Sequence, residues 1–204
     1  MLQLKTVSPK LLELLVKLMQ HEALTPFYLV GGTALALQLG HRLSIDLDFF
    51  GNQELDELEI NNILKEYVGN FQIVQKTKNI LIYAADDIKI DFVNYPFPWL
   101  AEPIKEESIR LASLEDIAAM KLNAISGRGS KKDFVDIYFL LKTYNLKELL
   151  VFYERKYPNG SLFLVLKSLN YFEDAEQQEM PMMLVPVDWQ EIKTTIIEQT
   201  LSII

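Results

Sequence analysis

The chain has no cysteine and only two histidines among its 204 residues. The lack of cysteine excludes disulfides and thiolate metal sites, and nothing in the sequence requires an oxidising compartment. With so few histidines, the histidine-rich bimetal site of many metal-dependent phosphoesterases is disfavoured. No segment approaches the roughly 18 uninterrupted apolar residues that a membrane-spanning helix requires.

A recognisable targeting signal is absent as well. Residues 9–19 read PKLLELLVKLM, and Glu13 and Lys17 interrupt the apolar run. This pattern is typical of an amphipathic helix rather than of a signal peptide. We therefore expect a cytoplasmic protein with no membrane partner.

Charge is unevenly distributed along the chain. The net charge is −8, but basic residues dominate between residues 121 and 156, whereas acidic residues dominate after residue 173. A basic middle region of this kind is able to contact polyphosphate or RNA. The alternative is that these lysines and arginines only form the solvated surface of helices.

The apolar pattern predicts a sheet-containing lobe that is followed by helices. The expected strands are Phe27–Val30, Ile45–Phe50, Phe71–Thr77, Ile80–Ala84 and Ile88–Tyr95. The expected helices among them are Thr33–Leu39 and Leu55–Val68. Three prolines at positions 96, 98 and 103 mark the expected end of the sheet, because proline disrupts regular strands.

The remainder of the chain is predicted to be helical. Ser113 and Ser130 have the spacing of N-caps, so a helix is expected after each of them, with two or three more beyond, one near Asp188–Leu201. We thus predict an α/β (α+β) fold with a mixed sheet flanked by helices in residues 1–98. A helical C-terminal lobe, residues 99–204, is expected to complete the active-site cleft.

Two aspartates provide the clearest chemical signal. In the segment IDLDFF, the strand period of two places Asp46 and Asp48 on one face of the strand. The apolar residues Ile45, Leu47 and Phe49 fall on the other face. Two like charges so close together resist burial unless a cation neutralises them, and oxygen-only ligands favour Mg²⁺ or Mn²⁺. An edge strand with a solvated face is the alternative interpretation.

A later strand, KIDFV, carries Asp91 between apolar residues. Three strand-borne carboxylates can hold two metal ions, which in a phosphoryl transfer contact the attacking and the leaving oxygen. On its own, Asp91 would be an ordinary acid at the end of a strand. Its significance comes from the pair that precedes it.

Gly31, Gly32 and Thr33 lead directly into a predicted helix. Two glycines let a phosphate approach the backbone closely, and the N–H groups at a helix start bind anions. Gly-Gly before a helix is also a common turn, in which Thr33 would serve only as the N-cap.

The order of these motifs resembles that of the nucleotidyltransferase superfamily, because VGGTALALQLGHRLSIDLDFF is followed by KIDFV. The segments LEDIAAMKL at residues 114–122 and KDFVDIY at residues 132–138 extend the likeness and are similar to the AbiEii/AbiGii toxin family of abortive infection systems. The resemblance spans Phe27 to about Leu141, and the helices after about Thr143 match nothing. It implies a nucleotidyltransferase core in the N-terminal lobe.

The resemblance also implies three groups of site residues. The metal ligands are Asp46, Asp48 and Asp91. The residues that hold the triphosphate are Gly31, Gly32 and Thr33. The other residues that match catalytic or nucleotide-binding positions of the family are Lys121, Asp133, Arg42, Ser44, Arg128 and Asp136.

The roles in this last group are less direct. Lys121 and Asp133 would form a polar network beside the nucleotide, and Arg42 would steady a phosphate or the second aspartate of the pair. Each residue also has a structural alternative. Lys121 would then extend along an amphipathic helix, Asp133 would cap one, and Asp136 would pair with Arg128.

The implied function is transfer of a nucleoside monophosphate from a nucleoside triphosphate to an acceptor, with Mg²⁺ or Mn²⁺ as the cofactor. By analogy with relatives, the acceptor is the 3′ end of tRNA. The protein would be the toxin of a toxin–antitoxin or abortive infection system, with a cognate antitoxin as its partner. Two alternatives remain: a nucleotide-binding regulator that has lost catalysis, and a transferase that modifies a protein hydroxyl.

Overall fold

The computed structural model describes residues 1–203, and these contain a seven-stranded mixed sheet. Its strands are β1 (Tyr28–Leu29), β2 (Leu47–Gly51), β3 (Phe71–Lys76), β4 (Ile80–Ala85), β5 (Ile88–Asn94), β6 (Ile104–Glu106) and β7 (Ile109–Leu111). Their order is β3-β4-β5-β2-β1-β7-β6, so β2 and β5 are neighbours, and they run parallel. The predicted α/β fold with a mixed sheet is confirmed.

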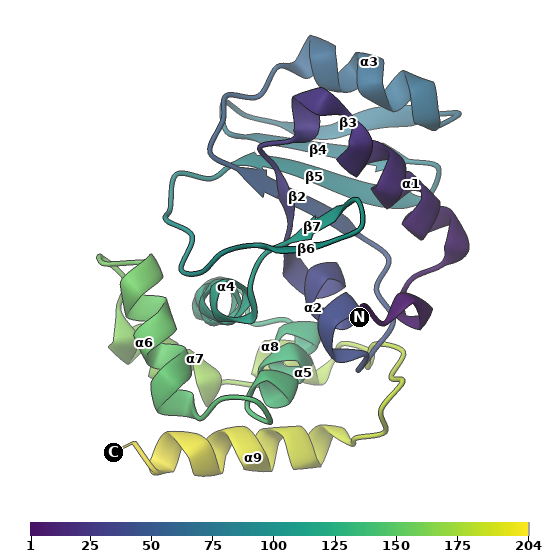
Figure 1. Ribbon diagram of the computed structural model, residues 1–204. Helices are drawn as coiled ribbons and strands as arrows, with labels where there is room; N and C mark the ends of the chain where they lie inside the picture. Colours follow the sequence, from purple (N-terminus) through teal and green to yellow (C-terminus); the bar gives the residue numbers. More distant parts are fainter. Residues whose placement is uncertain (204) are drawn as a thin grey trace.

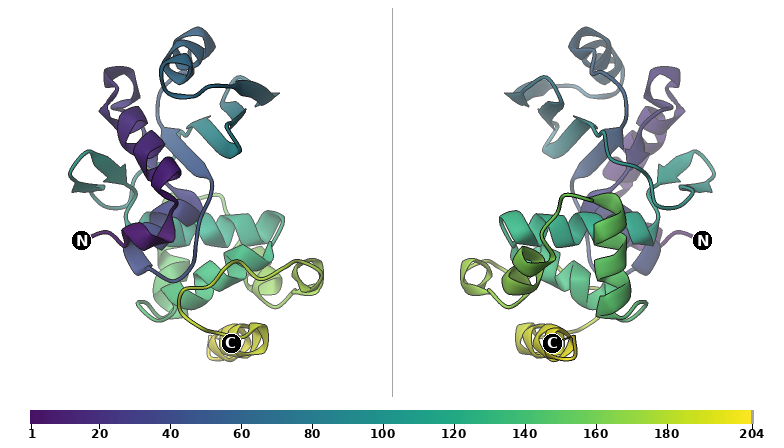
Figure 2. Two further views of the ribbon diagram at one scale, coloured as in Figure 1. Left: turned by 90° about the vertical axis from the view of Figure 1, so that its right-hand side faces the viewer. Right: turned by 90° about the vertical axis from the view of Figure 1, so that its left-hand side faces the viewer.

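Helices form the rest of the structure. They are α1 (Pro9–Gln20), α2 (Gly31–Leu39), α3 (Glu57–Tyr67), α4 (Leu114–Gly127), α5 (Lys131–Leu140), α6 (Leu146–Lys156), α7 (Leu162–Leu169), α8 (Glu173–Glu176) and α9 (Trp189–Leu201), with short 3₁₀ turns at Leu4–Thr6 and Glu22–Leu24. The sheet, α1 and α3 form one lobe, and α4 to α9 form the other (Figures 1 and 2). No helix within residues 1–203 is long and apolar enough to cross a membrane.

Helix α1 forms where the sequence predicts it. Ser8 caps the helix by accepting a hydrogen bond from the Leu11 N–H, and Pro9 occupies the first turn, where a missing N–H is tolerated. Leu11, Leu15 and Leu18 recur at helical spacing and are buried. This apolar stripe packs α1 against the sheet lobe.

Strands β2 and β5 form the centre of the sheet. Leu47 and Phe49 are fully buried, whereas Asp48 between them is half-buried on the opposite face. Phe49 stacks on Phe92 of β5 with ring centroids 5.2 Å apart. Ile45, which the strand pattern places on the buried face, is instead 70% exposed because β2 begins only at Leu47.

The sheet continues beyond the prolines, contrary to the expectation from the sequence. The prolines lie in the loop between β5 and β6, and the β6–β7 hairpin follows. Strand β7 pairs in parallel with β1 through Leu111 and Leu29. The prolines thus end β5 only, and strands of three residues are too short to give a clear alternating pattern. The division of the chain at residue 98 stays a prediction.

Within residues 1–203, four helices follow α5 rather than the expected two or three. Between α8 and α9, the chain returns to the sheet lobe. The Leu43 N–H donates to the Met182 carbonyl oxygen (2.8 Å), and the Leu184 N–H donates to the His41 carbonyl oxygen (2.9 Å). Residues 182–185 are therefore a C-terminal strap that holds the segment leading to β2.

Candidate active site

A cavity of about 470 Å³ lies between the sheet and the helical lobe. Strands β2, β4 and β5, the start of α2, and helix α4 contribute to its walls. Thr33 and Asp136 do not line it, whereas the other predicted metal, triphosphate and catalytic residues do, namely Gly31, Gly32, Arg42, Ser44, Asp46, Asp48, Asp91, Lys121, Arg128 and Asp133. The fold therefore gathers side chains that are widely spaced in the sequence.

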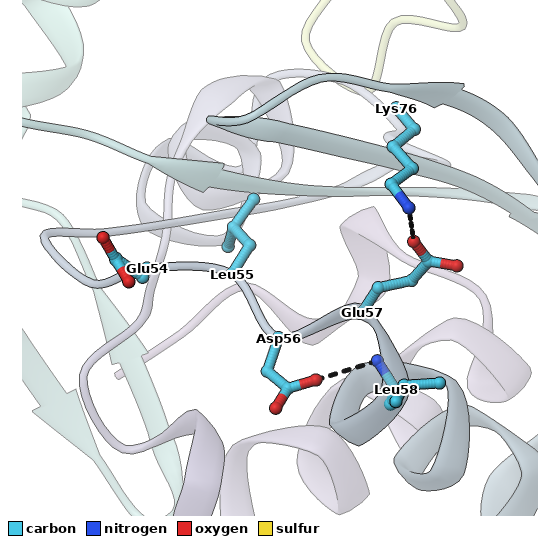
Figure 3. A pocket seen from close by; sticks show the side chains of 6 residues that line it. All are labelled: Glu54, Leu55, Asp56, Glu57, Leu58 and Lys76. Atoms are coloured by element: carbon cyan, nitrogen blue, oxygen red, sulfur yellow. Dashed lines mark hydrogen bonds and ion pairs between the residues drawn. The ribbon is translucent and has the colours of Figure 1, made fainter.

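A second hollow, of about 520 Å³, lies beside the start of α3 (Figure 3). Three of its four charged side chains engage one another or the backbone. Lys76 pairs with Glu57, and Asp56 caps α3 by accepting a hydrogen bond from the Leu58 N–H (2.9 Å). None of the predicted site residues lines this hollow. The chemistry therefore points to the first cavity.

The carboxylates of Asp48 and Asp91 lie on adjacent strands. The two residues are register partners in the parallel pair β2–β5, so their side chains leave the same face of the sheet. Asp46 lies just before β2 and lines the same cavity. Burial, with a further contribution from the negative charge of Asp91, raises the pKa of Asp48 to about 6.

Two lysines partly neutralise these acids. Lys89 pairs with Asp91, and the Lys132 ammonium is 3.5 Å from Asp46 Oδ2. Asp91 Oδ1 is nevertheless buried and has no hydrogen-bond partner. A buried carboxylate oxygen without a partner is unfavourable, and a cation would satisfy it.

A set of oxygen ligands fits Mg²⁺ or Mn²⁺ better than softer metals. Within residues 1–203, no three or more histidine or acidic side chains are close enough to form a metal site on their own. The residues present therefore fit a metal that takes one or two carboxylates from the protein and its other ligands from phosphate and water. Mg²⁺ is usually bound in this way.

The two glycines at the start of α2 are required by the side chains that face them. Gly31 has φ +68°, which glycine adopts without strain, and a Cβ there would lie 2.2 Å from Asp48 Oδ2. A Cβ on Gly32 would lie 2.1 Å from Arg42 Nη2. The Gly-Gly motif thus lets a carboxylate and a guanidinium pack against the helix start.

Replacing Gly31 with alanine should displace the Asp48 carboxylate. The left-handed φ alone destabilises a residue with a side chain by roughly 1–2 kcal/mol. Displacing a reacting group by about 1 Å can lower a rate about 100-fold. We therefore expect a lower melting temperature and a loss of transfer of at least this size, measured by thermal denaturation and a radiolabel assay.

Gly127→Ala at the end of α4 is the matched control, since a Cβ there meets nothing within 4 Å. It should melt at the same or a higher temperature, because alanine is the better helix former. Wild-type transfer by the Gly31 variant would contradict the assigned packing of Asp48.

Thr33 is not the N-cap of α2, because the helix begins at Gly31 and Val30 takes the cap position. The Thr33 side chain is buried, and its hydroxyl lies 2.8 Å from Ser44 Oγ and in contact with the Asp46 carbonyl oxygen. It therefore fixes the segment before β2 instead of lining the cavity. A direct contact between Thr33 and a triphosphate stays a prediction.

A buried ion network centred on Asp136 lies beneath the cavity. Arg42 binds both carboxylate oxygens, with Nε 2.7 Å from Oδ1 and Nη2 2.9 Å from Oδ2. Lys121 Nζ is 2.6 Å from Asp136 Oδ2 and 2.8 Å from Asp133 Oδ1. His41 Nε2 is 2.9 Å from Asp136 Oδ1. Burial alone would raise the pKa of Asp136, but the positive charges of Lys121 and Arg42 hold this pKa well below its usual range.

This network corrects two of the sequence-based interpretations. The Arg42 guanidinium is bound by Asp136 rather than steadying the second aspartate of the pair. Asp136 pairs with Arg42 and Lys121, and not with Arg128. The expected contact between Lys121 and Asp133 is present, and Lys121 is buried rather than extended along a solvated surface.

Sequence reasoning missed a second polar cluster. Tyr95 and Tyr157 line the cavity, and Lys156 forms a fully buried ion pair with Asp116, with Nζ 2.7 Å from Oδ1. A signal for Lys156 exists, since it follows Tyr153 by three residues on the buried face of α6. A lysine on an apolar stripe needs a buried partner.

A mixed sheet with acidic side chains on adjacent parallel strands, a glycine turn at a helix start and a facing helical lobe together define a nucleotidyltransferase. The chain belongs to the nucleotidyl transferase AbiEii toxin family of type IV toxin–antitoxin systems, which matches residues 13–202. This match is longer than the resemblance seen between Phe27 and Leu141. It includes the C-terminal helices, in which the sequence alone matched nothing.

Individual proteins are similar to this chain in sequence or in fold. The uncharacterized protein aq_aa25 of Aquifex aeolicus (strain VF5) is 41% identical over 158 residues, which cover 74% of this chain and 76% of that protein. The nucleotidyltransferase toxin MenT4 of Mycobacterium tuberculosis H37Rv has a TM-score of 0.61 at 14% identity, covering 94% of this chain and 81% of that chain. JHP933 of Helicobacter pylori has a TM-score of 0.57 at 21% identity, covering 95% and 88%. MenT4 and JHP933 thus share the fold of this chain.

Proposed function

We propose that this nucleotidyltransferase uses Mg²⁺ or Mn²⁺ to transfer a nucleoside monophosphate from a nucleoside triphosphate to an acceptor hydroxyl. The acceptor oxygen forms a bond to the α-phosphorus, the α–β phosphoanhydride bond breaks, and pyrophosphate leaves. The observation that carries the proposal is the side-by-side register of Asp48 and Asp91 at the cavity.

Asp48 and Asp91 would hold the metal, with Asp46 beside them. When bound, the metal would stabilise the charge that develops on the transferring phosphate and would lower the pKa of the acceptor hydroxyl. The acceptor loses its proton as the new bond forms. That proton would pass to solvent water, because Asp48 and Asp91 are occupied by the metal.

The start of α2 supports binding of the triphosphate. Gly31 and Gly32 line the cavity at a helix N-terminus, where N–H groups favour anions. Arg128 and Lys132 line the same cavity and supply positive charge. Lys121 adds a charge that two buried aspartates hold in place, so it needs no reorganisation during the reaction.

We further propose that the acceptor is the 3′ end of tRNA and that the protein acts as a toxin with a cognate antitoxin. The basic residues Arg128 and Lys132 at the cavity support an RNA acceptor. Membership of a toxin family supports the toxic role. The two proposed substrates, a nucleoside triphosphate and tRNA, occur in the cytoplasm, which supports the expected cytoplasmic location.

Incubation of the purified protein with α-labelled nucleoside triphosphates, Mg²⁺, and total RNA or total protein tests the proposal. We expect label in the tRNA fraction, no transfer in EDTA, and recovery when excess Mg²⁺ or Mn²⁺ is added. Mg²⁺ together with the preferred triphosphate should also raise the melting temperature, since a ligand that binds only the folded state stabilises it.

Other outcomes of this assay would change the assignment. Label in protein would replace tRNA by a protein hydroxyl as the acceptor. A rise in melting temperature without transfer to any acceptor would favour the nucleotide-binding regulator. Neither transfer nor a melting shift with any of the four triphosphates would contradict the proposed function.

A further inference from the structure

The wall of the active-site cavity changes from acidic to aromatic along the two central strands. Phe50 follows Asp48 by two residues on β2, so both side chains face the cavity. Tyr95 follows β5, which carries Asp91 and runs parallel to β2. The Phe50 and Tyr95 rings are 5.1 Å apart. The aromatic side chains therefore lie together, beyond the carboxylates in the direction of both strands.

Tyr157 extends this aromatic wall from the helical lobe. Its hydroxyl is 2.5 Å from the Tyr95 hydroxyl, and both residues line the cavity. Burial raises the pKa of Tyr157 to about 12, so this hydroxyl keeps its proton at neutral pH. Two protonated hydroxyls that share one hydrogen bond retain one proton to donate elsewhere. The wall thus combines aromatic faces with a hydrogen-bond donor.

A buried ion pair between Lys156 and Asp116 lies beside Tyr95 and Tyr157. Lys156 Nζ donates to Asp116 Oδ1 (2.7 Å) and to the Pro98 carbonyl oxygen (2.8 Å). The same ammonium lies over the Tyr95 ring, 5.0 Å from its centroid, and over the Trp99 ring at 4.7 Å. The pair therefore joins the start of α4, the end of α6 and the loop after β5.

Stability alone does not explain this ion pair. Apolar residues of similar volume often replace a buried ion pair without loss of stability, so a contribution to geometry is the alternative to be tested. Lys156 immediately precedes Tyr157 and contacts the Tyr95 ring. Asp116 also accepts a hydrogen bond from the Leu100 N–H (2.9 Å), which fixes the loop beside Tyr95.

We propose that the aromatic wall of Phe50, Tyr95 and Tyr157 binds the nucleobase of the triphosphate, and that the Lys156–Asp116 pair positions this wall. The inference rests on the proposed function. A nucleoside triphosphate has a flat aromatic base at one end and a polyanion at the other. The aromatic wall suits the base, and the start of α2 with Arg128 suits the polyanion, while a metal held by Asp48 and Asp91 would offset the repulsion between these carboxylates and the phosphates. Bases stack on aromatic side chains with little dependence on sequence, and the remaining hydroxyl proton can donate to an acceptor on the base.

Titration calorimetry with two kinds of ligand tests the base site. The probes are ATP, GTP, CTP and UTP, and inorganic tripolyphosphate, each with Mg²⁺. Tyr157→Ala should weaken the best-bound nucleotide about 5- to 150-fold, the range that stacking of one base supplies, and leave the affinity for tripolyphosphate unchanged. Tyr171→Ala, at an exposed tyrosine outside the cavity, is the matched control and should change neither affinity.

The outcomes separate this inference from the proposed function. Tyr157→Ala would overturn the base site if it weakened nucleotide and tripolyphosphate binding equally, or if it weakened neither. The proposed function would remain intact in both cases. Failure of the wild-type protein to bind any nucleotide or tripolyphosphate would overturn the proposed function itself, and the base site with it.

The positioning role has its own test. The double variant Lys156→Met with Asp116→Asn removes both buried charges together, so no uncompensated charge prevents folding. We expect it to bind tripolyphosphate as the wild type does and to lose most of the additional affinity that the base provides. Tyr157→Phe removes only one hydroxyl. It should keep the stacking and lose a smaller part of the affinity that the base provides. A folded double variant with wild-type nucleotide affinity would limit the pair to a structural role.

Discussion

Replacing Asp48 with asparagine should abolish nucleotidyl transfer and leave the metal-free protein at least as stable as the wild type. Burial and Asp91 raise the pKa of Asp48 to about 6, so the folded state disfavours the charged form. At neutral pH this charge therefore opposes folding in the absence of a cation. Asparagine has nearly the same shape without the charge, and its melting temperature without Mg²⁺ should be equal or higher.

The expected loss of transfer is about 1,000-fold or more, because a catalytic metal supplies several kcal/mol of transition-state stabilisation. The stabilisation of the wild type by Mg²⁺ and nucleotide should shrink in the variant. If transfer causes toxicity, wild-type expression should arrest bacterial growth and the variant should be harmless at equal expression. Radiolabel transfer, thermal melting with and without Mg²⁺, and growth after induction measure the three effects.

Asp174→Asn is the matched control, since Asp174 is exposed on α8 and does not line the cavity. It should match the wild type in all three measurements. Normal transfer by the Asp48 variant would remove this residue from the metal site. Growth arrest by an inactive Asp48 variant would mean that toxicity has another cause.

Replacing Lys121 with methionine should destabilise the fold strongly. The Lys121 ammonium pairs with both Asp133 and Asp136, and its side chain is only 8% exposed. Removing one partner from a buried ion pair leaves an uncompensated charge and costs about 3–5 kcal/mol of unfolding free energy. Urea unfolding measures this loss. Lys167→Met on the exposed surface of α7 is the control and should change stability by less than about 0.5 kcal/mol.

A double variant separates stability from chemistry. Lys121→Met combined with Asp133→Asn removes one positive and one negative charge, and Arg42 still pairs with Asp136. Much of the stability should return. If Lys121 also stabilises charge on the reacting phosphate, transfer by the folded double variant should stay about 100-fold below the wild type. Recovery of wild-type transfer along with stability would limit Lys121 to a structural role.

Several cavity residues could be predicted from the sequence because their signals are local. The period of two in a strand puts Asp46 and Asp48 on one side, and Asp91 stands in a later strand between apolar residues. Gly31 and Gly32 stand out because glycine permits backbone and close contacts that other residues do not. Such signals need no knowledge of the tertiary fold.

The partners of these residues could not be predicted, because long-range packing determines them. His41 and Arg42 meet Asp136 although 95 and 94 residues separate them in the chain. Nothing near Asp136 in the sequence indicates which cation it contacts. The β6–β7 hairpin was missed for a related reason, since pairing with β1 stabilises strands that are too short to show a pattern. For Lys156, the apolar stripe of α6 indicates that a buried partner is needed but not that this partner is Asp116.

The C-terminal strap affects the order in which the protein can mature on the ribosome. Residues 182–185 supply backbone hydrogen bonds to the segment that carries His41 and Arg42. A nascent chain that stops short of the strap already contains every proposed metal ligand. Its His41 carbonyl and Leu43 N–H nevertheless lack these partners, so the segment that presents Arg42 to Asp136 is not yet fixed. The backbone of this segment is therefore fully hydrogen-bonded only after residues 182–185 have joined the chain.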